Sequence, residues 1–216
     1  MNYDRPIMMD LERLLIVCAT EREVPRVGFG RVVVCGVGKT AAALITAREL
    51  AAGGVSAVIS FGVAGALPGS GLQVGDVAVG TLTRLLDEGL DTGELFVSFA
   101  DGPMPVPGGE DAPTDVVLTG RLLADTDVSF RVESGLIGTV SVCAGTDRLA
   151  IQRARCGAIA EAMEGAAVAL AAQQFGVPFA EVRGISNLCG PRDGAPFELD
   201  LAVQHATRVL ARLDTP

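Results

Sequence analysis

Short, continuous runs of apolar residues recur along the chain. The first run, RLLIVCA, has the length of a strand and is apolar after its first residue, which is typical of a strand covered on both faces. Similar runs, or a weaker apolar–polar alternation, predict the other strands. The expected strands cover residues 13–19, 31–38, 56–67, 75–86, 134–145, 158–163 and 177–186.

Helical patterns follow most of these strands, and the expected helices cover residues 38–54, 114–125, 146–156, 164–176 and 198–213. The first is rich in alanine, with Leu44, Ala47 and Ala51 on one apolar stripe and a stop signal at Gly53. Strands that alternate with helices predict an α/β fold with a mixed central sheet flanked by helices. In such folds, ligands bind where loops leave the carboxyl ends of the strands.

Residues 87–113 interrupt this alternation. They are acidic, rich in Gly and Pro and poorly periodic, which predicts a long excursion without regular structure. A loop of that length within a compact domain is usually functional or mobile. No linker divides the 216 residues, so we expect one domain that covers residues 1–216.

Composition narrows the class of protein. Hydrophobic residues make up 49% of the chain and there are 27 glycines, which indicates a globular protein with a substantial core. The net charge of -9 argues against nucleic acid as a partner. The start of the chain has acidic residues before its first apolar run, and the uncharged residues 51–75 are interrupted by Gly, Ser and Pro. We therefore expect neither a signal peptide nor a membrane span.

Cysteine and histidine usage excludes several kinds of site. The five cysteines are odd in number and lack the spacing of metal ligands, which favours a reducing compartment, the cytoplasm. His205 is the single histidine, and we expect it on the polar surface of the last helix. A Ser-His or Cys-His catalytic pair and a His-based metal site are therefore not expected. We predict no metal and no organic cofactor.

Polar residues gather at the predicted strand ends. Glu23 follows the first strand, a Gly-rich turn at 62–65 follows the third, and Asn187 follows the last. Glu164 and Arg183 stand in apolar segments, where each charge needs a partner because an uncompensated buried charge costs several kcal/mol. Polar groups that converge at such an edge are typical of a small-molecule site.

The segment CGVGKT lacks the first glycine of a phosphate-binding loop, so it predicts a tight strand-to-helix turn with Lys39 at the start of the helix.

In order and spacing, the segments ATEREV, CGVGKTAAA, SFGVAGAL, AMEGAAVA and FGVPFAEVRGISN resemble the nucleoside phosphorylase/nucleosidase superfamily. The similarity is greatest to its methylthioadenosine/adenosylhomocysteine nucleosidases and to their relatives, the futalosine hydrolases. It covers about residues 13–213, apart from the excursion at 87–113. The resemblance implies a partly barrel-like mixed sheet and a homodimer or larger homo-oligomer.

The resemblance also implies roles for individual residues. Glu23 matches the residue that activates the attacking water. Met163 and Glu164 match the pair that holds the ribose of a purine nucleoside, so a ribose diol, together with Arg183, would compensate Glu164. Other matches lie near the sugar and base: Ala64, Gly65, Ser186 and Asn187.

Two departures from the family pattern predict the chemistry. Ser60 and Val63 stand where family phosphorylases place an Arg and a Ser or Thr that bind phosphate, which favours water as the nucleophile. Asn187 stands where adenine-specific nucleosidases carry Asp. A neutral amide can donate to the O6 of a 6-oxopurine and accept from a protonated N7, which favours hypoxanthine as the leaving base.

We therefore expect hydrolysis of futalosine to hypoxanthine and dehypoxanthinylfutalosine, a step of menaquinone biosynthesis. Arg192 is a candidate for the benzoate of this substrate, although a surface pair with Asp193 explains it equally well. Backbone contacts near Gly145 and Thr146 are the alternative source of base specificity. The alternative functions are an adenine-type nucleosidase, which acts on methylthioadenosine, adenosylhomocysteine or aminofutalosine, and a non-catalytic nucleoside-binding protein.

Overall fold

The computed structural model describes residues 10–93, 96–99, 111–124 and 128–215. Its main sheet has eight strands. They are β1 (Leu14–Cys18), β2 (Arg31–Val34), β3 (Ala57–Ala66), β4 (Val77–Leu85), β7 (Ala112–Pro113), β8 (Val132–Thr139), β9 (Ala158–Ala162) and β10 (Phe179–Leu188).

The sheet closes on itself because β10 pairs with two strands, parallel to β3 and antiparallel to β4. The ring then runs from β4 through β8 and β9 back to β3, while β1 and β2 extend from the outer edge of β3. Most of these pairs are parallel, but β3 and β9 pair antiparallel. The predicted fold class, a mixed and partly barrel-like sheet, is confirmed.

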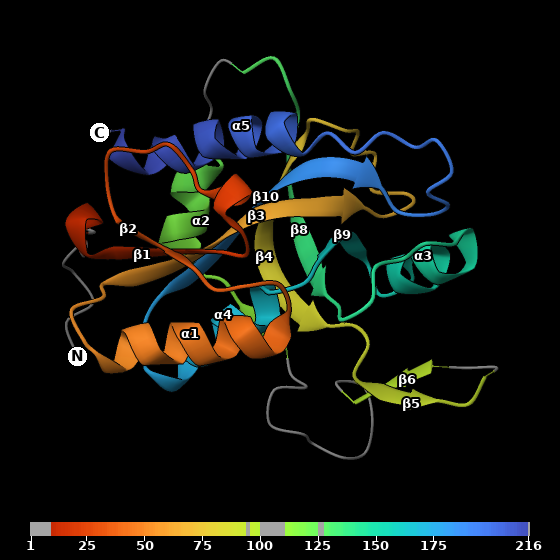
Figure 1. The fold of residues 1–216 in the computed structure, drawn as a ribbon, viewed down its shortest axis with the longest axis horizontal. Helices are drawn as coiled ribbons and strands as arrows, with labels where there is room; N and C mark the ends of the chain where they lie inside the picture. The colour runs from red at the N-terminus through yellow and green to blue at the C-terminus, as the bar shows by residue number, and fades with distance from the viewer. Residues whose placement is uncertain (1–9, 94–95, 100–110, 125–127, 216) are drawn as a thin grey trace.

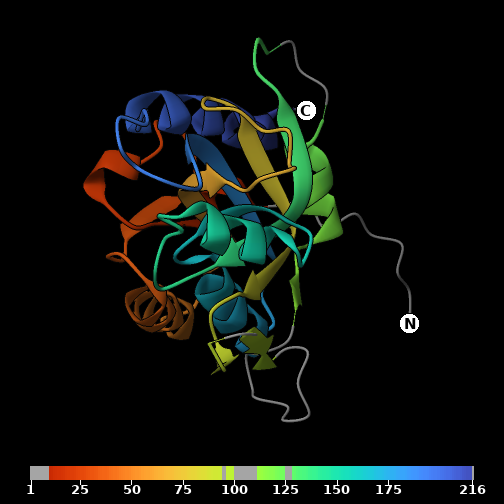
Figure 2. The same ribbon diagram turned by 90° about the vertical axis from the view of Figure 1, so that its right-hand side faces the viewer.

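Helices cover both sides of the sheet (Figure 1). On one side, α2 (Val116–Leu122) and α5 (Leu199–Leu210) pack on a core built from β1, β3, β4 and β10. On the other, α1 (Lys39–Ala51) lies beside α4 (Gly165–Gln174). The remaining helix, α3 (Asp147–Ala154), lies at the end toward which β3 and β10 run, in front of the sheet in Figure 2. None of the described helices is long and apolar enough to cross a bilayer.

Two expectations about the helices are wrong. Leu44 is 67% exposed, and α1 buries Ala42, Thr46 and Leu50 instead. An alanine-rich helix is nearly uniform around its circumference, so the pattern alone does not specify which stripe faces α4. His205 is half-buried rather than on the surface: its Nδ1 lies 2.6 Å from the carbonyl oxygen of Gly75, and its ring stacks on Phe130.

The excursion at 87–113 contains short strands where none were expected. In its described part, β5 (Gly89–Asp91) and β6 (Phe96–Ser98) form a hairpin that projects from the sheet (Figure 1), and β7 pairs with β4. These strands are too short to produce a readable pattern. The predicted loop at 94–95 and 100–110 lies outside the described residues.

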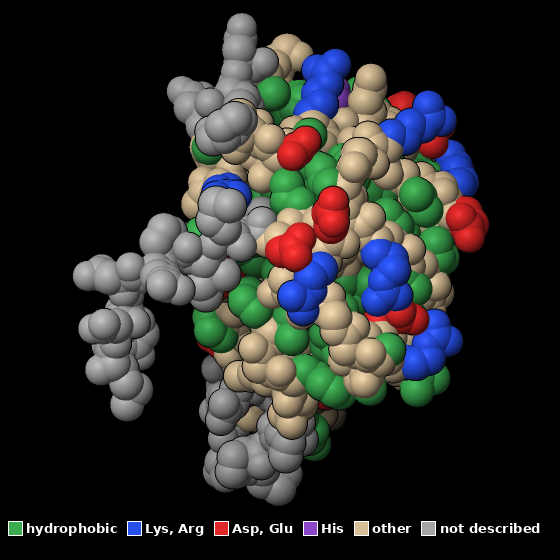
Figure 3. Space-filling view, turned by 90° about the vertical axis from the view of Figure 1, so that its left-hand side faces the viewer, with side chains coloured by type: hydrophobic (Ala, Val, Ile, Leu, Met, Phe, Trp, Pro, Cys, Tyr) green, Lys and Arg blue, Asp and Glu red, His purple; other side chains and the backbone are tan. Residues whose placement is uncertain are grey.

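Charged side chains of both signs are interspersed with hydrophobic ones on the face where β1 and β3 begin (Figure 3). Among the described residues of that face there is no continuous basic patch. The distribution gives no support to a nucleic-acid surface there.

Candidate active site

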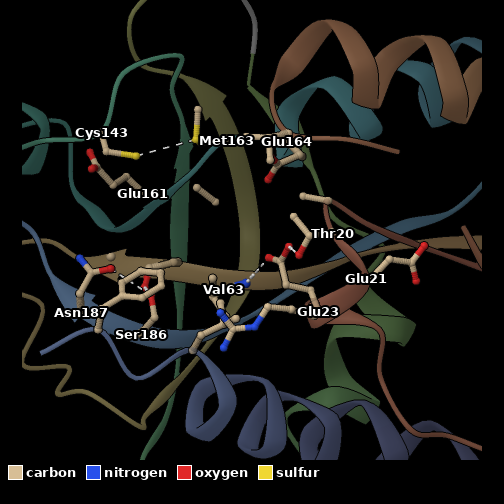
Figure 4. Close-up of a pocket in the computed structure, with 18 of the residues that line it drawn as sticks. Thr20, Glu21, Glu23, Val63, Cys143, Glu161, Met163, Glu164, Ser186 and Asn187 are labelled. Atoms are coloured by element: carbon tan, nitrogen blue, oxygen red, sulfur yellow. Dashed lines mark hydrogen bonds between the residues drawn. The ribbon is translucent and has the colours of Figure 1, made fainter. Parts of the chain in front are cut away.

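A cavity of about 510 Å³ opens at the carboxyl ends of β1, β3, β9 and β10, where the strand pattern places a ligand site. Its size is typical of small-molecule sites. The cavity brings together eight of the candidate residues, several of which are labelled in Figure 4: Glu23, Ala64, Gly65, Met163, Glu164, Ser186, Asn187 and Arg192.

Glu23 lies in the 3₁₀ turn Glu21–Glu23 that follows β1, and only 5% of it is exposed. Its Oε2 accepts a hydrogen bond from the Thr20 hydroxyl at 2.8 Å, and its Oε1 accepts from the Val63 backbone N–H at 3.3 Å. These bonds hold the carboxylate against residues 62–65. The expected turn at 62–65 is wrong, because the structure places these residues inside β3 (Ala57–Ala66), where they pair with β10. Glu21, in the same turn, is exposed.

Glu164 lies two residues after β9 and directly precedes α4, and it is 6% exposed. Its Oε1 accepts from the Gly38 backbone N–H at 2.9 Å, and its Oε2 lies 3.5 Å from Arg183 Nη1. The glycine-rich turn before α1 therefore supports a carboxylate. Lys39, next in that turn, pairs with Asp87 and Glu88.

Arg183 lies beneath the cavity floor rather than in its lining, with 1% of it exposed. Its Nε donates to Glu181 at 2.9 Å and its Nη2 donates to the Ser60 hydroxyl at 2.7 Å. Burial disfavours the cation, but the carboxylates of Glu181 and Glu164 outweigh burial and raise the pKa of the guanidinium. The arginine thus orients Glu164 from below.

Asn187 occupies the opposite end of the cavity from Glu23 (Figure 4). A register shift in β10 between Ile185 and Asn187 turns two consecutive polar side chains, Ser186 and Asn187, toward the site. The Ser186 hydroxyl donates to Asn187 Oδ1 at 2.9 Å, and Asn187 Nδ2 donates to the Leu188 carbonyl at 3.0 Å. One amide hydrogen of Asn187 is left for a ligand.

Gly65 makes room for this arrangement. A Cβ at that position would lie 2.7 Å from the sulfur of Cys189 and 2.9 Å from Asn187 Nδ2. Met163 lies on the opposite wall, where its sulfur is 3.8 Å from that of Cys143. Apolar walls with a few fixed polar groups are typical of sites for flat, partly apolar ligands.

The structure does not bring Thr146 to the cavity. Its hydroxyl caps α3 by accepting from the Leu149 N–H at 3.3 Å. Arg192 does line the cavity, on the loop after β10, and the described residues include no ion pair between it and Asp193. Within the described residues, no three His, Cys, Asp or Glu side chains are placed to hold a metal ion.

Our sequence analysis missed two buried carboxylates. Glu161 of β9 lines the cavity, and Glu181 of β10 is fully buried against Arg183. The sequence does contain a signal for Glu181. Residues two apart on a strand share a face, so an ion pair between Glu181 and Arg183 could have been predicted. Glu161 had no such signal, since its partner Arg153 comes from a helix.

The chain is also similar in sequence to a known family of proteins. Residues 16–215 match the family model described as the phosphorylase superfamily. This chain belongs to that superfamily. The match spans every strand that contributes to the cavity except the first residues of β1.

Similar members of the phosphorylase superfamily have nucleosidase or hydrolase names. A futalosine hydrolase from Acidothermus cellulolyticus is 35% identical over 84% of this chain and 74% of its own length. A 5'-methylthioadenosine/S-adenosylhomocysteine nucleosidase from Bacillus cereus is 31% identical over 82% of this chain and 77% of its own length.

The fold is shared with solved nucleosidase structures. The 5'-methylthioadenosine/S-adenosylhomocysteine nucleosidase of Neisseria meningitidis, solved with methylthio-immucillin-A, superposes with a TM-score of 0.78. The superposition covers 94% of this chain and 99% of that one, at 24% sequence identity.

Proposed function

We propose that this protein hydrolyses the N-glycosidic bond of futalosine and releases hypoxanthine. The observation that carries the proposal is Glu23, a buried carboxylate held by two hydrogen bonds at one end of the cavity, with an amide, Asn187, at the other. A base and a leaving-group partner on opposite sides of a nucleoside are the minimum that this reaction needs.

The proposed reaction uses both ends of the cavity. The bond between C1′ of the ribose and N9 of the base breaks, and the base leaves with the electron pair while the sugar becomes oxocarbenium-like. Water attacks C1′ and transfers a proton to Glu23, the departing base takes a proton from solvent, and Glu23 returns its proton to solvent to complete the cycle. Glu164, already held by Gly38 and Arg183, is oriented to accept from the sugar hydroxyls.

The charged residues beneath the cavity floor favour water over phosphate as the nucleophile. Ser60 accepts from Arg183, and the guanidinium is already compensated by Glu181 and Glu164. A phosphate dianion near Glu23 and Glu164 would have no free buried cation among the described residues of the floor. Its desolvation would be poorly compensated there.

The anionic tail of futalosine is matched by Arg192. This residue lines the cavity, and no ion-pair partner for it is found in the described part of the chain. We propose that it binds the benzoate carboxylate at the mouth. The 5'-methylthioadenosine/S-adenosylhomocysteine nucleosidase relatives support the alternative, an adenine nucleoside as substrate.

A product assay on the purified protein tests the proposal. Futalosine, aminofutalosine, inosine and methylthioadenosine are each supplied with and without phosphate, and the bases and sugars are separated by chromatography. We expect hypoxanthine and a free sugar hydroxyl from futalosine in phosphate-free buffer. Strict dependence on phosphate contradicts the hydrolase, faster release of adenine favours the alternative substrate, and no turnover with any of them favours a nucleoside-binding protein.

The resemblance to the superfamily also leads us to propose a homodimer or larger homo-oligomer. Sedimentation velocity across a range of protein concentrations tests this, and a single species of the mass of one chain contradicts it.

A further inference from the structure

Glu161 is a buried carboxylate in the cavity wall for which the proposed reaction has no role. It lies on β9, three residues before Glu164, and 4% of it is exposed. In Figure 4 it lies on the same side of the cavity as Asn187 and Cys143, away from Glu23. It therefore belongs to the end at which the base is proposed to bind.

Glu161 occupies a backbone hydrogen-bond donor of the loop after β8. Its Oε1 accepts from the Ala144 N–H at 2.6 Å, and its Oε2 accepts from Arg153 Nη1 at 2.5 Å. The Ala144 carbonyl in turn accepts from the Gly190 N–H at 3.0 Å. Because the N–H of Ala144 is occupied by a carboxylate, this donor is not available to a base.

The group that replaces this donor is an acceptor. An ionised carboxylate only accepts hydrogen bonds, and each of its oxygens has more than one lone pair. Hypoxanthine carries a donor, N1–H, beside its O6 acceptor, whereas adenine carries an acceptor at N1 beside an amino donor. Glu161 and Asn187 thus offer an acceptor for N1–H and a donor for O6 of hypoxanthine. With adenine, the Glu161 acceptor would face another acceptor, N1.

We propose that Glu161 is a specificity-determining residue that accepts from N1–H of a 6-oxopurine, while Asn187 donates to O6. This inference rests on the proposed function, since it concerns the base of the same nucleoside. Arg153 supplies the cation that a buried carboxylate needs, through an ion pair in which both side chains are buried. Burial, and next the carboxylate of Glu161, raise the pKa of the adjacent Cys189 thiol, so no second anion competes there.

The test compares two base identities in one variant. Glu161→Gln keeps the shape and an acceptor oxygen but adds an NH₂ donor that can face N1 of adenine. We expect kcat/KM for futalosine relative to aminofutalosine to fall about ten- to a hundredfold, the effect of one mismatched buried hydrogen bond. Asp147→Asn is the matched control, because Asp147 is exposed and outside the cavity lining, and it should leave the ratio unchanged.

The outcomes separate this inference from the function on which it rests. A native protein that releases hypoxanthine, with a variant that loses both activities equally, overturns the inference and leaves the function intact. A native protein that prefers aminofutalosine overturns the choice of substrate and the inference together.

If the Glu161→Gln variant does not fold, a binding measurement on the native protein tests the inference instead. Calorimetry should find 1-methylhypoxanthine, which lacks the N1 donor, at least tenfold weaker than hypoxanthine, and equal affinity overturns the inference.

Discussion

At the scale of single residues, the buried carboxylates of the site differ in whether a cation or only neutral donors contact them. Glu164 and Glu181 share one guanidinium, whereas Glu23 accepts hydrogen bonds from two neutral donors, the Thr20 hydroxyl and the backbone N–H of Val63 in β3. Glu181 lies outside the cavity lining, and Glu164 is held by the Gly38 N–H and Arg183. Glu23 is therefore the carboxylate of this group that is placed to take a proton from water.

The first prediction concerns that carboxylate. Glu23→Gln keeps the hydrogen bond from Val63 but removes the basic group, so we expect kcat for base release to fall by about 100-fold or more. KM should change little, because the lost interaction forms mainly in the transition state. Steady-state kinetics measure both, with Glu21→Gln in the same turn as a control of near-native activity. A fully active Glu23→Gln variant would mean that another group activates the water.

A second prediction concerns the amide at the other end. Asn187→Asp places an acceptor opposite O6 of hypoxanthine but gains a partner in the amino group of adenine. We expect kcat/KM to shift roughly ten- to a hundredfold toward aminofutalosine relative to futalosine. Parallel assays of the two substrates give the ratio. An equal loss on both would assign Asn187 to holding β10 or the departing nitrogen rather than to reading the base.

At the scale of elements, close packing of α5 on β10 keeps the polar end of β10 in place. A Cβ on Gly184 would overlap the backbone oxygen of Ala202, a buried residue in the first turn of α5. The overlapped atom is backbone, so the contact can be relieved only if the helix and strand separate. Arg183 precedes this glycine and Asn187 follows it, so the separation would also move the site.

The third prediction tests this contact. Gly184→Ala should lower the free energy of unfolding by about 1–3 kcal/mol, as overpacked cores do. The matched control is Gly120→Ala, on the exposed face of α2 with no atom near its would-be Cβ, which should leave stability unchanged or raise it slightly. Urea denaturation gives both values. Equal stability of the Gly184→Ala variant and the native protein would show that α5 shifts freely on the sheet.

At the scale of the whole molecule, the cavity exists only where segments distant in sequence converge. Cys143, on the loop after β8, and Met163, at the end of β9, meet across one wall. Burial, and next the carboxylate of Glu161, raise the pKa of the Cys143 thiol. Its alkylation should therefore accelerate with rising pH, because the thiolate is the nucleophile.

The fourth prediction uses Cys143 as a reporter of occupancy. Hypoxanthine or a substrate analogue should slow alkylation of Cys143 by iodoacetamide at pH about 8.5. Cys156 is also exposed but does not line the cavity, so it serves as an internal control whose rate should not change. Peptide mass spectrometry measures both rates. Equal protection of the two thiols, or none, would contradict binding in this cavity.

The sequence by itself determined the elements and their class. Every long strand and helix was readable, because apolar runs of strand length and helical periodicity are local properties. Glu23, Glu164 and Asn187 could be singled out because each lies at or shortly after the end of a strand, and strand ends can be located from the sequence. The match to the superfamily confirms the resemblance, and the shared fold of a solved structure confirms the fold class.

The tertiary structure alone decided how distant residues are paired. Closure of the sheet through β10, the face of α1 that is buried, and the contact of His205 with Gly75 all depend on long-range packing. The same holds for the partners of the buried charges. Glu164 is compensated from a turn 126 residues earlier and Glu161 from a neighbouring helix, because a buried charge needs whichever donor the fold brings near it, and no local pattern encodes that neighbour.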